Sequence, residues 1–498
     1  MRCAGNRQPP GYGDRLMGWS VPEVPARGPA AAWSPWICLF ILFFGICIAL
    51  AWALLTAPAG GLSSLPSDAR LLLTGYTLMA VMAAVTFYLL WWETKALGIW
   101  YWNSWRLNMH TAWQRQAHQH LCVVSRVMLT PDAQRIPRLI GLASQEEGED
   151  KSTTLLPDEV LVPGISRFEQ LCRKLIAQAT STLSRWYPAG GVTVIVQTSS
   201  DTENTAQEQR ERIIAIWQQQ ALPWKVTVQI LPTTFPFEYW NKQLLERKHP
   251  VLVLALHYRQ PGETQAEMAG ALLLMPPSLL PSAARADALK LFRAMPLQTN
   301  KLTAELKELR DMVQQPAEAI RLIWFSGLTA PQRQLLATAT HGLSLHLSGS
   351  APMTGLIDFD RGSEQYGHLA SWLMMVAAAE TADYETGSHW LVWADDKQAW
   401  AMAAGIETAV PYQRSEMALT APFPAGGITL AVLLHSVLLW CLGSKYPVWL
   451  FSWWGASCVL LMLGIMLPGI ALLLRKSVAR LLLPAFIRTA AKQGSKVK

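Results

Sequence analysis

Apolar residues run without interruption through two stretches near the start of this chain. Residues 36–57 (WICLFILFFGICIALAWALLTA) and 71–92 (LLLTGYTLMAVMAAVTFYLLWW) contain no charged side chain. A helix that crosses the hydrocarbon core of a bilayer needs about 20 apolar residues, so the pattern predicts a transmembrane hairpin. A cleaved signal peptide, with a weak processing site at Leu55-Thr56-Ala57, is the alternative for the first stretch. We favour a span because the apolar region of a signal peptide is usually about 7–15 residues long.

The same pattern returns near the end of the chain. Residues 426–443 and 447–474 are again apolar, and the junction GSKYP between them is polar. We expect a second transmembrane hairpin there, with Pro468 as a kink in its longer helix. Together the two pairs of apolar stretches predict an α-helical membrane protein with four transmembrane helices.

Between the two hairpins the pattern changes to that of an α/β domain, which we place at residues 166–421. Short apolar runs such as VTVIVQ (192–197) and VLVLALHY (251–258) alternate with segments of helical spacing. Unbroken apolar strands that alternate with helices indicate a mostly parallel sheet covered on both faces. The second half, from IRLIWFSG (320–327) to AWAMAAGIE (399–407), repeats the order of the first half. We interpret this repetition as an internal duplication.

Several segments complete this layout. Residues 1–35 are rich in Gly, Pro and Ala, which predicts a disordered cytoplasmic tail. Residues 93–165 predict a helix along the membrane surface, followed by a linker that contains the acidic run SQEEGEDKSTTLLPDE. Residues 475–498 form a basic cytoplasmic tail. Within the domain, we expect residues 276–315 to be helical and SLHLSG (344–349) to be a strand.

Positive charge is distributed unevenly about the predicted spans. Lys and Arg precede the first span and follow the second and the fourth, whereas residues 58–70 carry one Arg against one Asp. Because cytoplasmic flanks are enriched in Lys and Arg, both termini and the α/β domain are expected in the cytoplasm. The cationic residues concerned are Arg2, Arg7, Arg15, Arg27, Lys95, Arg106, Arg115, Arg475, Lys476, Arg480, Arg488, Lys492, Lys496 and Lys498.

Composition changes this picture only in the choice of partner. The net charge of +7 lies largely beside the spans, so we expect anionic lipid at the cytoplasmic face as a partner, and no nucleic acid. Many of the 23 Trp lie at span edges, which is typical of the aromatic belt of a membrane protein. The seven Cys show no paired spacing that would indicate disulfides or zinc. No glycine-rich phosphate loop occurs where a strand meets a helix, so no cofactor is expected.

A Gly-His pair opens one apolar helix of the predicted domain. Tyr366-Gly367-His368 precedes LASWLMMVAAAE (369–380). This motif resembles the β-ketoacyl synthases, and the duplicated pattern of residues 192–407 is similar to their thiolase-like fold of layered sheets and helices. The resemblance implies that His368 holds the position of a catalytic histidine that polarises a thioester.

Other parts of the catalytic site of that family are replaced in this sequence. The resemblance implies a cysteine nucleophile at a helix N-terminus, where the helix dipole lowers the pKa of the thiol, but Leu231–Pro236 contains no cysteine. A second catalytic histidine would fall within Trp324–Thr329, which contains none. Ser363 stands where the family has a lysine. The resemblance therefore implies a degenerate relative, a pseudoenzyme without condensing activity.

Two groups of carboxylates are candidates for chemistry. Asp358 and Asp360, with Glu364 nearby, offer a pair for a metal ion or for acid-base catalysis. We favour a strand end followed by a loop as the explanation of this pair. Asp395-Asp396 indicates a hairpin turn, because Asp hydrogen-bonds to the backbone of turns.

Histidines suggest two further sites. His118 and His120 suggest a metal site, but on the predicted helix residues i and i+2 face different ways, so no metal is expected. His435 lies within a predicted span, where ionisable groups are costly and often functional. No other span carries an acidic partner for it, so we interpret it as a satisfied histidine of the helix bundle.

These observations lead to a non-enzymatic, multi-pass protein of the bacterial inner membrane, whose cytoplasmic thiolase-like domain docks a protein partner in a membrane complex. In its layout the chain also resembles inner-membrane accessory proteins encoded at enterobacterial type VI secretion loci. An acyl-transfer or lipid-modifying enzyme at the membrane face, using His368, stays open as the alternative. A transporter that uses His435 is a third interpretation, although the spans lack the polar-lined, glycine-broken helices typical of secondary transporters.

Overall fold

The computed structural model of this chain consists of two compact units. The α/β unit contains Ala112–Gln413, and the helical unit contains Ser20–Thr111 and Arg414–Lys498. The structure describes residues 24–56, 66–132, 134–141, 154–156, 164–199, 203–258, 266–348, 355–360, 366–382, 384, 387–408 and 420–496.

The described strands of the α/β unit form one mixed sheet, ordered β3-β2-β4-β5-β1-β6-β11-β10-β8-β9, with β7 paired to β11. Pairing is parallel for β2 with β3 and β4, and for β8 with β9 and β10, and antiparallel elsewhere. The strands are β1 (His120–Leu129), β2 (Gly191–Thr198), β3 (Lys225–Ile230), β4 (Val251–His257), β5 (Met268–Met275), β6 (Leu289–Phe292), β7 (Met295–Leu297), β8 (Ile320–Ser326), β9 (Leu356–Asp358), β10 (Ser388–Ala394) and β11 (Ala399–Gly405).

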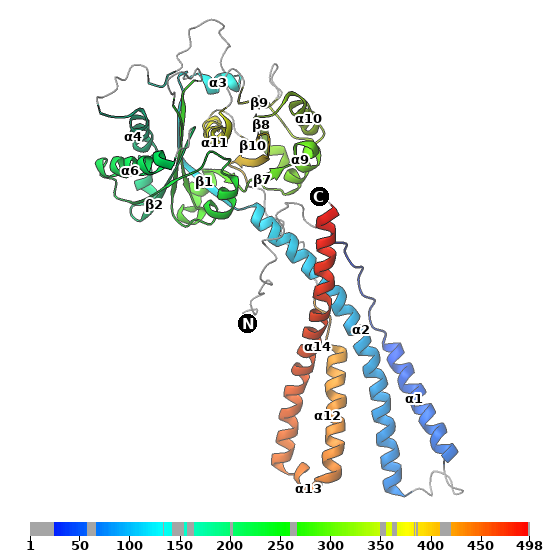
Figure 1. Ribbon diagram of the computed structural model, residues 1–498. Helices are drawn as coiled ribbons and strands as arrows, with labels where there is room; N and C mark the ends of the chain where they lie inside the picture. The colour runs from blue at the N-terminus through cyan, green and yellow to red at the C-terminus, as the bar shows by residue number, and fades with distance from the viewer. Residues whose placement is uncertain are drawn as a thin grey trace. The chain divides into compact units, whose positions relative to one another are not determined.

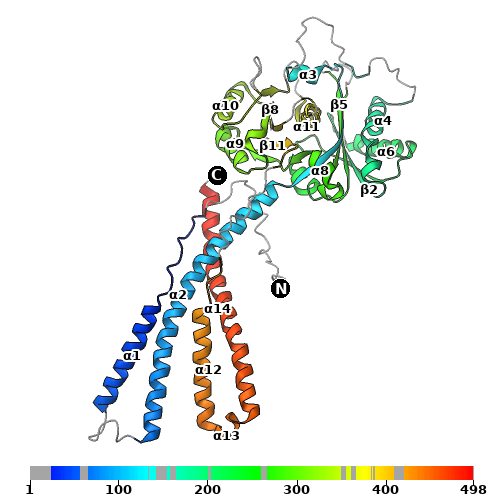
Figure 2. The ribbon, with the colours of Figure 1, turned by 180° about the vertical axis from the view of Figure 1, so that it is seen from behind.

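Helices cover this sheet in layers. The helix α11 (Ala370–Thr381) contacts strands of both halves and lies between β1 and β2 on one side and β8 and β10 on the other (Figure 1). Figure 2 shows α4 and α6 outside the first group of strands and α9 and α10 outside the second. The remaining helices are α3 (Arg135–Leu139), α4 (Arg167–Thr180), α5 (Leu183–Trp186), α6 (Glu203–Gln219), α7 (Phe237–Tyr239), the π-helix η2 (Trp240–Leu244), α8 (Ser282–Asp287), α9 (Leu302–Asp311), α10 (Ala330–His341), and the 3-10 helices η3 (Pro277–Leu279), η4 (Thr299–Lys301), η5 (Ala317–Ala319) and η6 (Gly367–Leu369).

The layers explain why the strands are apolar on both faces. Successive side chains of a strand point to opposite faces of the sheet. In β4, Leu252 and Leu254 pack into the core beneath α4 and α6, whereas Val253 and Ala255 pack into the central core around α11. A third core beneath α9 and α10 contains Trp390 of β10. A strand that must fill two cores has no polar face, as the sequence predicted.

The predicted duplication is visible in the strand order. The first half has the order β3-β2-β4-β5 and the second half β9-β8-β10-β11, with matching parallel and antiparallel pairs. Both halves end in an antiparallel hairpin, β4–β5 and β10–β11. The α/β nature of the domain is therefore confirmed. The expectation of a mostly parallel sheet is wrong, because β1, β6, β7 and the hairpin strands β5 and β11 pair antiparallel with their neighbours.

Three sequence-based boundaries need correction. The predicted linker, residues 93–165, contains β1, which pairs with β5 and β6 in the middle of the sheet, so the α/β unit begins well before residue 166. The stretch 276–315 contains the short strands β6 and β7 between its helices. Residues 344–348 are not a strand, because this part of the chain makes no ladder with a neighbour.

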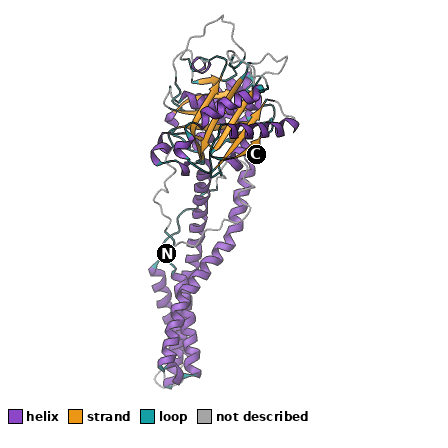
Figure 3. Cartoon of the chain, turned by 90° about the vertical axis from the view of Figure 1, so that its left-hand side faces the viewer, coloured by secondary structure: helices purple, strands orange, loops and turns teal. Residues whose placement is uncertain are grey.

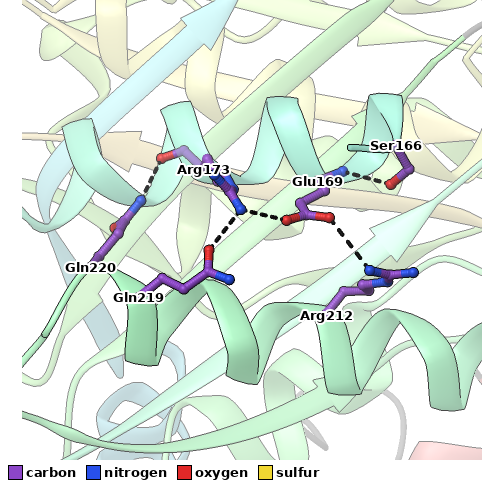
Figure 4. A network of polar contacts seen from close by, with 6 residues as sticks. All are labelled: Ser166, Glu169, Arg173, Arg212, Gln219 and Gln220. Carbon is purple, nitrogen blue, oxygen red and sulfur yellow. Dashed lines mark hydrogen bonds and ion pairs between the residues drawn. The ribbon is translucent and has the colours of Figure 1, made fainter. Parts of the chain in front are cut away.

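Polar side chains hold α4 against α6 on the outer face of the unit (Figure 4). The hydroxyl of Ser166 accepts from the backbone N–H of Glu169 and caps α4. The Glu169 carboxylate pairs with Arg173 at 2.7 Å and with Arg212 of α6 at 3.7 Å. Arg173 also donates to Gln219 of α6 at 2.6 Å. These contacts fix the outermost layer next to the first half of the sheet.

The helical unit contains four described helices that are long and apolar enough to cross a membrane. They are α1 (Pro35–Thr56), α2 (Ser67–Ala117), α12 (Ala425–Lys445) and α14 (Trp453–Lys496), with the short α13 (Pro447–Leu450) before α14. Helices alone make up the described secondary structure of this unit (purple in Figure 3). The predicted spans agree with α1 and α12 to within two residues.

Two of these helices are longer than the predicted spans. The second span and the expected surface helix are one continuous helix, α2, because no proline interrupts residues 67–117. The basic segment after the fourth span also belongs to a helix, since α14 continues through Pro468 and Pro484 to Lys496. The expected surface helix and the expected basic tail are thus continuations of α2 and α14.

Residues 24–34, called the N-terminal segment below, correct the expectation of a disordered tail for the part of residues 1–35 that the structure describes. The backbone N–H and C=O of Arg27 bond to the Asn103 side chain of α2 at 3.0 and 2.9 Å. The indoles of Trp92 and Trp102 donate to the carbonyl oxygens of Ala31 and Pro25. Indole donors of α2 thus satisfy a segment that forms no secondary structure of its own.

Candidate functional site

Gln197 joins three segments at the end of β2. Its side chain is completely buried. Its Nε2 group donates to the carbonyl oxygens of Pro232 at 2.5 Å and Thr234 at 2.8 Å, and its Oε1 accepts from Nε1 of Trp372 in α11 at 2.7 Å. Both N–H groups of the amide are used, so nothing of its donor capacity is left for a ligand. Pro232 and Thr234 belong to the turn Leu231–Pro236, at which the sequence resemblance implied a nucleophilic cysteine.

Aromatic rings fill the interior beside this turn. Phe237, Trp240 and Trp372 are each less than 2% exposed. The ring centroids of Trp240 and Trp372 lie 6.1 Å apart, and Phe237 lies 4.6 Å from Trp393 of β10. All four belong to the central core around α11. The space between the two halves of the domain is therefore packed with side chains in this region.

His368 lies in η6, just before α11, and is partly exposed. Its Nε2 lies 2.9 Å from the carbonyl oxygen of Thr198, the last residue of β2. Because a carbonyl oxygen only accepts, the hydrogen must be on Nε2. Gly367 before it has φ of +54°, a backbone conformation that favours glycine. The predicted catalytic histidine thus lies next to the Gln197 join, with one ring nitrogen bonded to the backbone.

The cysteines of the α/β unit lie in a different core from His368. Cys122 of β1 and Cys172 of α4 are completely buried in the core between α4, α6 and the sheet, whereas Leu369 and Ala370 beside His368 belong to the central core. Burial raises the pKa of the Cys122 thiol to about 11 and that of the Cys172 thiol further. Both thiols are therefore neutral at physiological pH, and the thiolate is the nucleophilic form.

The second half of the domain has its own polar join. Asp360, which follows β9, accepts from the Ser326 hydroxyl at 2.9 Å and from the backbone N–H of Gly327 at 2.7 Å. Gly327 has φ of +73°, and a Cβ there would lie 2.0 Å from the carbonyl oxygen of Ala394. This tight turn occupies the place at which the resemblance implied a second histidine.

The remaining carboxylate candidates also have structural partners. Asp358 forms an ion pair with Arg333 at 2.7 Å and accepts from the backbone N–H of Asp360. Glu364, like Ser363, lies outside the described residues. Asp395 accepts from the backbone N–H groups of Lys397 and Gln398 at 2.7 Å each, so the predicted hairpin turn is confirmed.

His118 and His120 bond to the backbone. His118 Nε2 lies 3.3 Å from the Met312 carbonyl oxygen, and His120 Nδ1 lies 2.9 Å from the carbonyl oxygen of His118. Burial lowers the pKa of both imidazoles. Within the described part of the chain, no three His, Cys, Asp or Glu side chains come together as metal ligands.

The sequence analysis missed His389, the second residue of β10. The side chain is completely buried, and its Nδ1 accepts from the indole N–H of Trp324 at 3.2 Å. Burial lowers the pKa of His389 to about 4, so the imidazole is neutral at physiological pH. Its Nε2 has no hydrogen-bond partner among the described residues. The only sign of this burial in the sequence is that His389 stands next to the apolar run WLVW, which is a weak indication of a buried histidine.

Two ionisable groups, Glu93 and His435, are buried among the described residues of the helical unit. Glu93 of α2 is completely buried and accepts from the backbone N–H of Gly427, in the first turn of α12, at 2.8 Å. A carboxylate there is stabilised by the N-terminal end of the helix dipole. His435 of α12 is also buried, but its Nδ1 has no partner within the described residues, contrary to the expectation of a satisfied histidine. Glu93 was missed because it follows the apolar stretch by one residue.

Comparisons with known proteins give a likeness only among solved structures. A scan against protein-family models and a search of curated proteins both found no match. A chain of the type II polyketide synthase complex AntDE:AntF, an acyl-carrier protein with its ketosynthase, is 12% identical and aligns with a TM-score of 0.41, covering 58% of this chain and 99% of that one.

Two further solved structures give similar values. Cerulenin-bound OleA of Xanthomonas campestris is 10% identical with a TM-score of 0.35, covering 57% of this chain and 96% of that one. The 3-oxoacyl-(acyl carrier protein) synthase III FabH of Xanthomonas oryzae is 10% identical with a TM-score of 0.34, covering 57% and 98%. No functional conclusion rests on a likeness at this level.

Proposed function

We propose that this chain is a non-enzymatic membrane protein whose thiolase-like α/β domain docks a protein partner. The observation that carries the proposal is the buried join at Gln197. The two side-chain N–H groups of Gln197 donate to the carbonyl oxygens of Pro232 and Thr234, in the turn where a condensing enzyme would need its nucleophile. The neighbouring indole of Trp372 is bonded to the same amide. An interior that is packed and hydrogen-bonded in this way suits a binding module better than a reaction chamber.

The four apolar helices support the membrane part of the proposal. Their mean hydropathies over 18-residue windows are 2.8, 1.7, 2.0 and 2.5, and no more than 22% of any window is buried within the protein. Apolar surface of this extent needs lipid around it. Cations follow the fourth apolar stretch, among them the exposed Lys476 and Arg480, and we place anionic lipid headgroups of the inner membrane's cytoplasmic leaflet against them.

Co-purification tests the docking role. The full chain, carrying an affinity tag, is extracted in several mild detergents, and bound proteins are identified after gentle washing. We expect one stoichiometric membrane-complex partner, retained equally by the parent and by His368→Ala. Recovery of the tagged chain alone in every detergent would contradict the proposal. A partner from a type VI secretion assembly would support the resemblance in layout.

Labelling tests the orientation. A cysteine at Thr303, exposed on α9, is expected to be shielded from an impermeant maleimide in intact spheroplasts. A cysteine at Ser67, exposed at the start of α2, is expected to react and serves as the matched control. Reaction at Thr303 in intact spheroplasts would place the α/β unit outside the cytoplasm.

An acyl-transfer or lipid-modifying enzyme is the second candidate, and one observation favours it. His368 is partly exposed at the start of an apolar helix, and the bond from its Nε2 to the carbonyl oxygen of Thr198 holds the ring in one orientation. For an enzyme, His368→Ala abolishes the cellular function while the protein keeps its thermal stability. For a docking module, the same variant keeps both the function and the partner.

A further inference from the structure

A groove lies between the start of α2 and the end of α12 in the helical unit. Its volume is about 510 Å³, and Leu71, Leu72, Leu439 and Trp440 supply most of its lining. The Trp440 ring packs over Gly75 and lies 5.8 Å from the Tyr76 ring, so α12 contacts α2 through this side chain. The groove therefore belongs to the contact between two helices that carry apolar spans.

The polar atoms that line the groove are already satisfied. The hydroxyl of Ser436 donates to the carbonyl oxygen of Val432, and that of Ser444 donates to the carbonyl oxygen of Cys441, both at 2.9 Å. Hydroxyls bonded within their own helix offer little to a polar ligand. The groove thus presents hydrocarbon and an indole ring, which suit an apolar ligand.

Cations flank the groove at the ends of the spans. Arg70 immediately precedes Leu71, Lys445 immediately follows Ser444, and both are exposed. Asp68 is the one acidic residue in these two flanking turns, and its carboxylate accepts from the Ser67 hydroxyl. Tyr446, also exposed, adds a side chain typical of the membrane interface.

We propose that this groove binds an anionic phospholipid, with one acyl chain along Leu72 and Trp440 and the phosphate near Arg70 and Lys445. The complementarity is of two kinds, because hydrocarbon meets the apolar lining and the negative headgroup meets the cations. The proposal rests on the membrane anchoring proposed above. It concerns the span ends opposite Lys476 and Arg480, and so the other leaflet.

Native mass spectrometry of the full chain tests this site. The protein is released from detergent after incubation with phosphatidylglycerol or phosphatidylcholine, and retained lipid is counted. We expect one tightly retained phosphatidylglycerol and at least tenfold less phosphatidylcholine. The double variant Arg70→Gln, Lys445→Gln is expected to lose that preference, while Lys476→Gln, Arg480→Gln at the opposite span ends keeps it.

A second pair of variants tests the groove itself. Gly443→Phe places a large ring at a position that lines the groove, and a Cβ there makes only an ordinary contact of 3.5 Å with Leu450. Gly464→Phe on α14, where a Cβ meets nothing within 4 Å, is the matched control. We expect at least tenfold lower retention for Gly443→Phe only.

The outcomes separate this inference from the proposed anchoring. Equal retention in all variants, no retained lipid, or a dimer that occupies the groove would overturn the lipid site. In each of these cases the protein still fractionates with membranes. Recovery of the chain in the soluble fraction of lysed cells would instead overturn the anchoring.

Discussion

The two halves of the α/β unit differ in the polar side chain that connects their first two strands: one half uses a hydrogen-bond donor and the other an acceptor. In each half, a buried polar side chain connects the end of the first strand to the segment after the second strand. In the first half, Gln197 of β2 donates to carbonyl oxygens after β3. In the second half, Asp360 after β9 accepts from Ser326 and Gly327 at the end of β8. The two halves thus have a polar connection at the same position, but the buried side chain donates in the first half and accepts in the second.

This difference bears on function. In the condensing enzymes that the sequence resembles, these strand ends are expected to carry reactive groups. Here Gln197 and Asp360 use both ends for hydrogen bonds within the domain, and the partly exposed His368 lies beside the first of them. Breaking each join separately shows how much stability each one contributes.

The largest effect is expected for Gln197→Leu. The substitution leaves the buried indole of Trp372 without its acceptor, which costs about 1–3 kcal/mol. It also removes two hydrogen bonds to the carbonyl oxygens of Pro232 and Thr234, each worth about 0.5–1.5 kcal/mol. We expect the free energy of unfolding of the α/β unit to fall by about 4 kcal/mol, measured by urea titration in mild detergent. Gln218→Leu, at an exposed position of α6, is the control and should change it by less than about 0.5 kcal/mol. A loss below 1 kcal/mol for Gln197→Leu would mean that the join is not structural.

A buried histidine distinguishes the halves at acidic pH. His389 is the second residue of β10, whereas the second residue of β4 is Leu252. The pKa of His389 is lowered by burial from 6.5 to about 4, so below pH 6.5 the unfolded state binds a proton that the folded state does not. Folding stability therefore falls as the pH decreases from 6.5 to 4, by about 3 kcal/mol from this group.

His389→Gln measures that contribution. Burial also lowers the pKa of His118 and His120, which shifts stability in the same direction. The relevant quantity is therefore the difference between the parent and His389→Gln in urea titrations at pH 7 and pH 4. We expect the parent to lose about 3 kcal/mol more than the variant. Identical losses would show that His389 does not titrate in this range.

Gly327→Ala perturbs the second join through the backbone. A Cβ at this position would lie 2.0 Å from the Ala394 carbonyl oxygen, and φ of +73° is unfavourable for alanine. We expect a loss of about 2 kcal/mol in the free energy of unfolding. Gly342→Ala serves as the control, because its Cβ would lie 3.5 Å from the nearest atom and its φ is ordinary. Equal effects of the two substitutions would contradict the tight turn.

The smallest effect is expected for Asp360→Asn. The side chain keeps its shape, but one carboxylate oxygen becomes an amide that cannot accept from Ser326 or Gly327. A hydrogen bond to a charged group contributes about 1.5–3 kcal/mol, and partial rearrangement reduces the loss to about 1.5 kcal/mol. Asp396→Asn in the exposed hairpin turn is the control. A loss larger than that of Gln197→Leu would reverse the ranking of the two joins.

Local pattern was enough for much of the fold. The apolar runs predicted α1 and α12 closely, and the alternation of strands and helices predicted the duplicated half-domains. The strand β1 was missed because its partners are far away in the sequence, as in the pairing of Cys122 with Met275. The strands β6 and β7 were missed because runs of four and three residues carry no detectable period.

The candidate site was likewise predictable only where the sequence carries a local motif. The sequence motif singled out His368, and its neighbour Thr198 lies 170 residues away, a distance that no local pattern can bridge. The Gln197 join has no sequence signal, because a glutamine at the end of a strand is ordinary. Glu93 shows the same limit in the helical unit, since its contact with Gly427 depends on how α2 meets α12.

The N-terminal segment sets a practical limit on shortened versions of the protein. Val24 is only 2% exposed and packs with Trp102 and Phe486. A version that begins at Trp36 would leave two indole donors and the Asn103 amide of α2 without their backbone partners. Expression trials should therefore start the chain at or before Val24, with any fusion placed ahead of that residue.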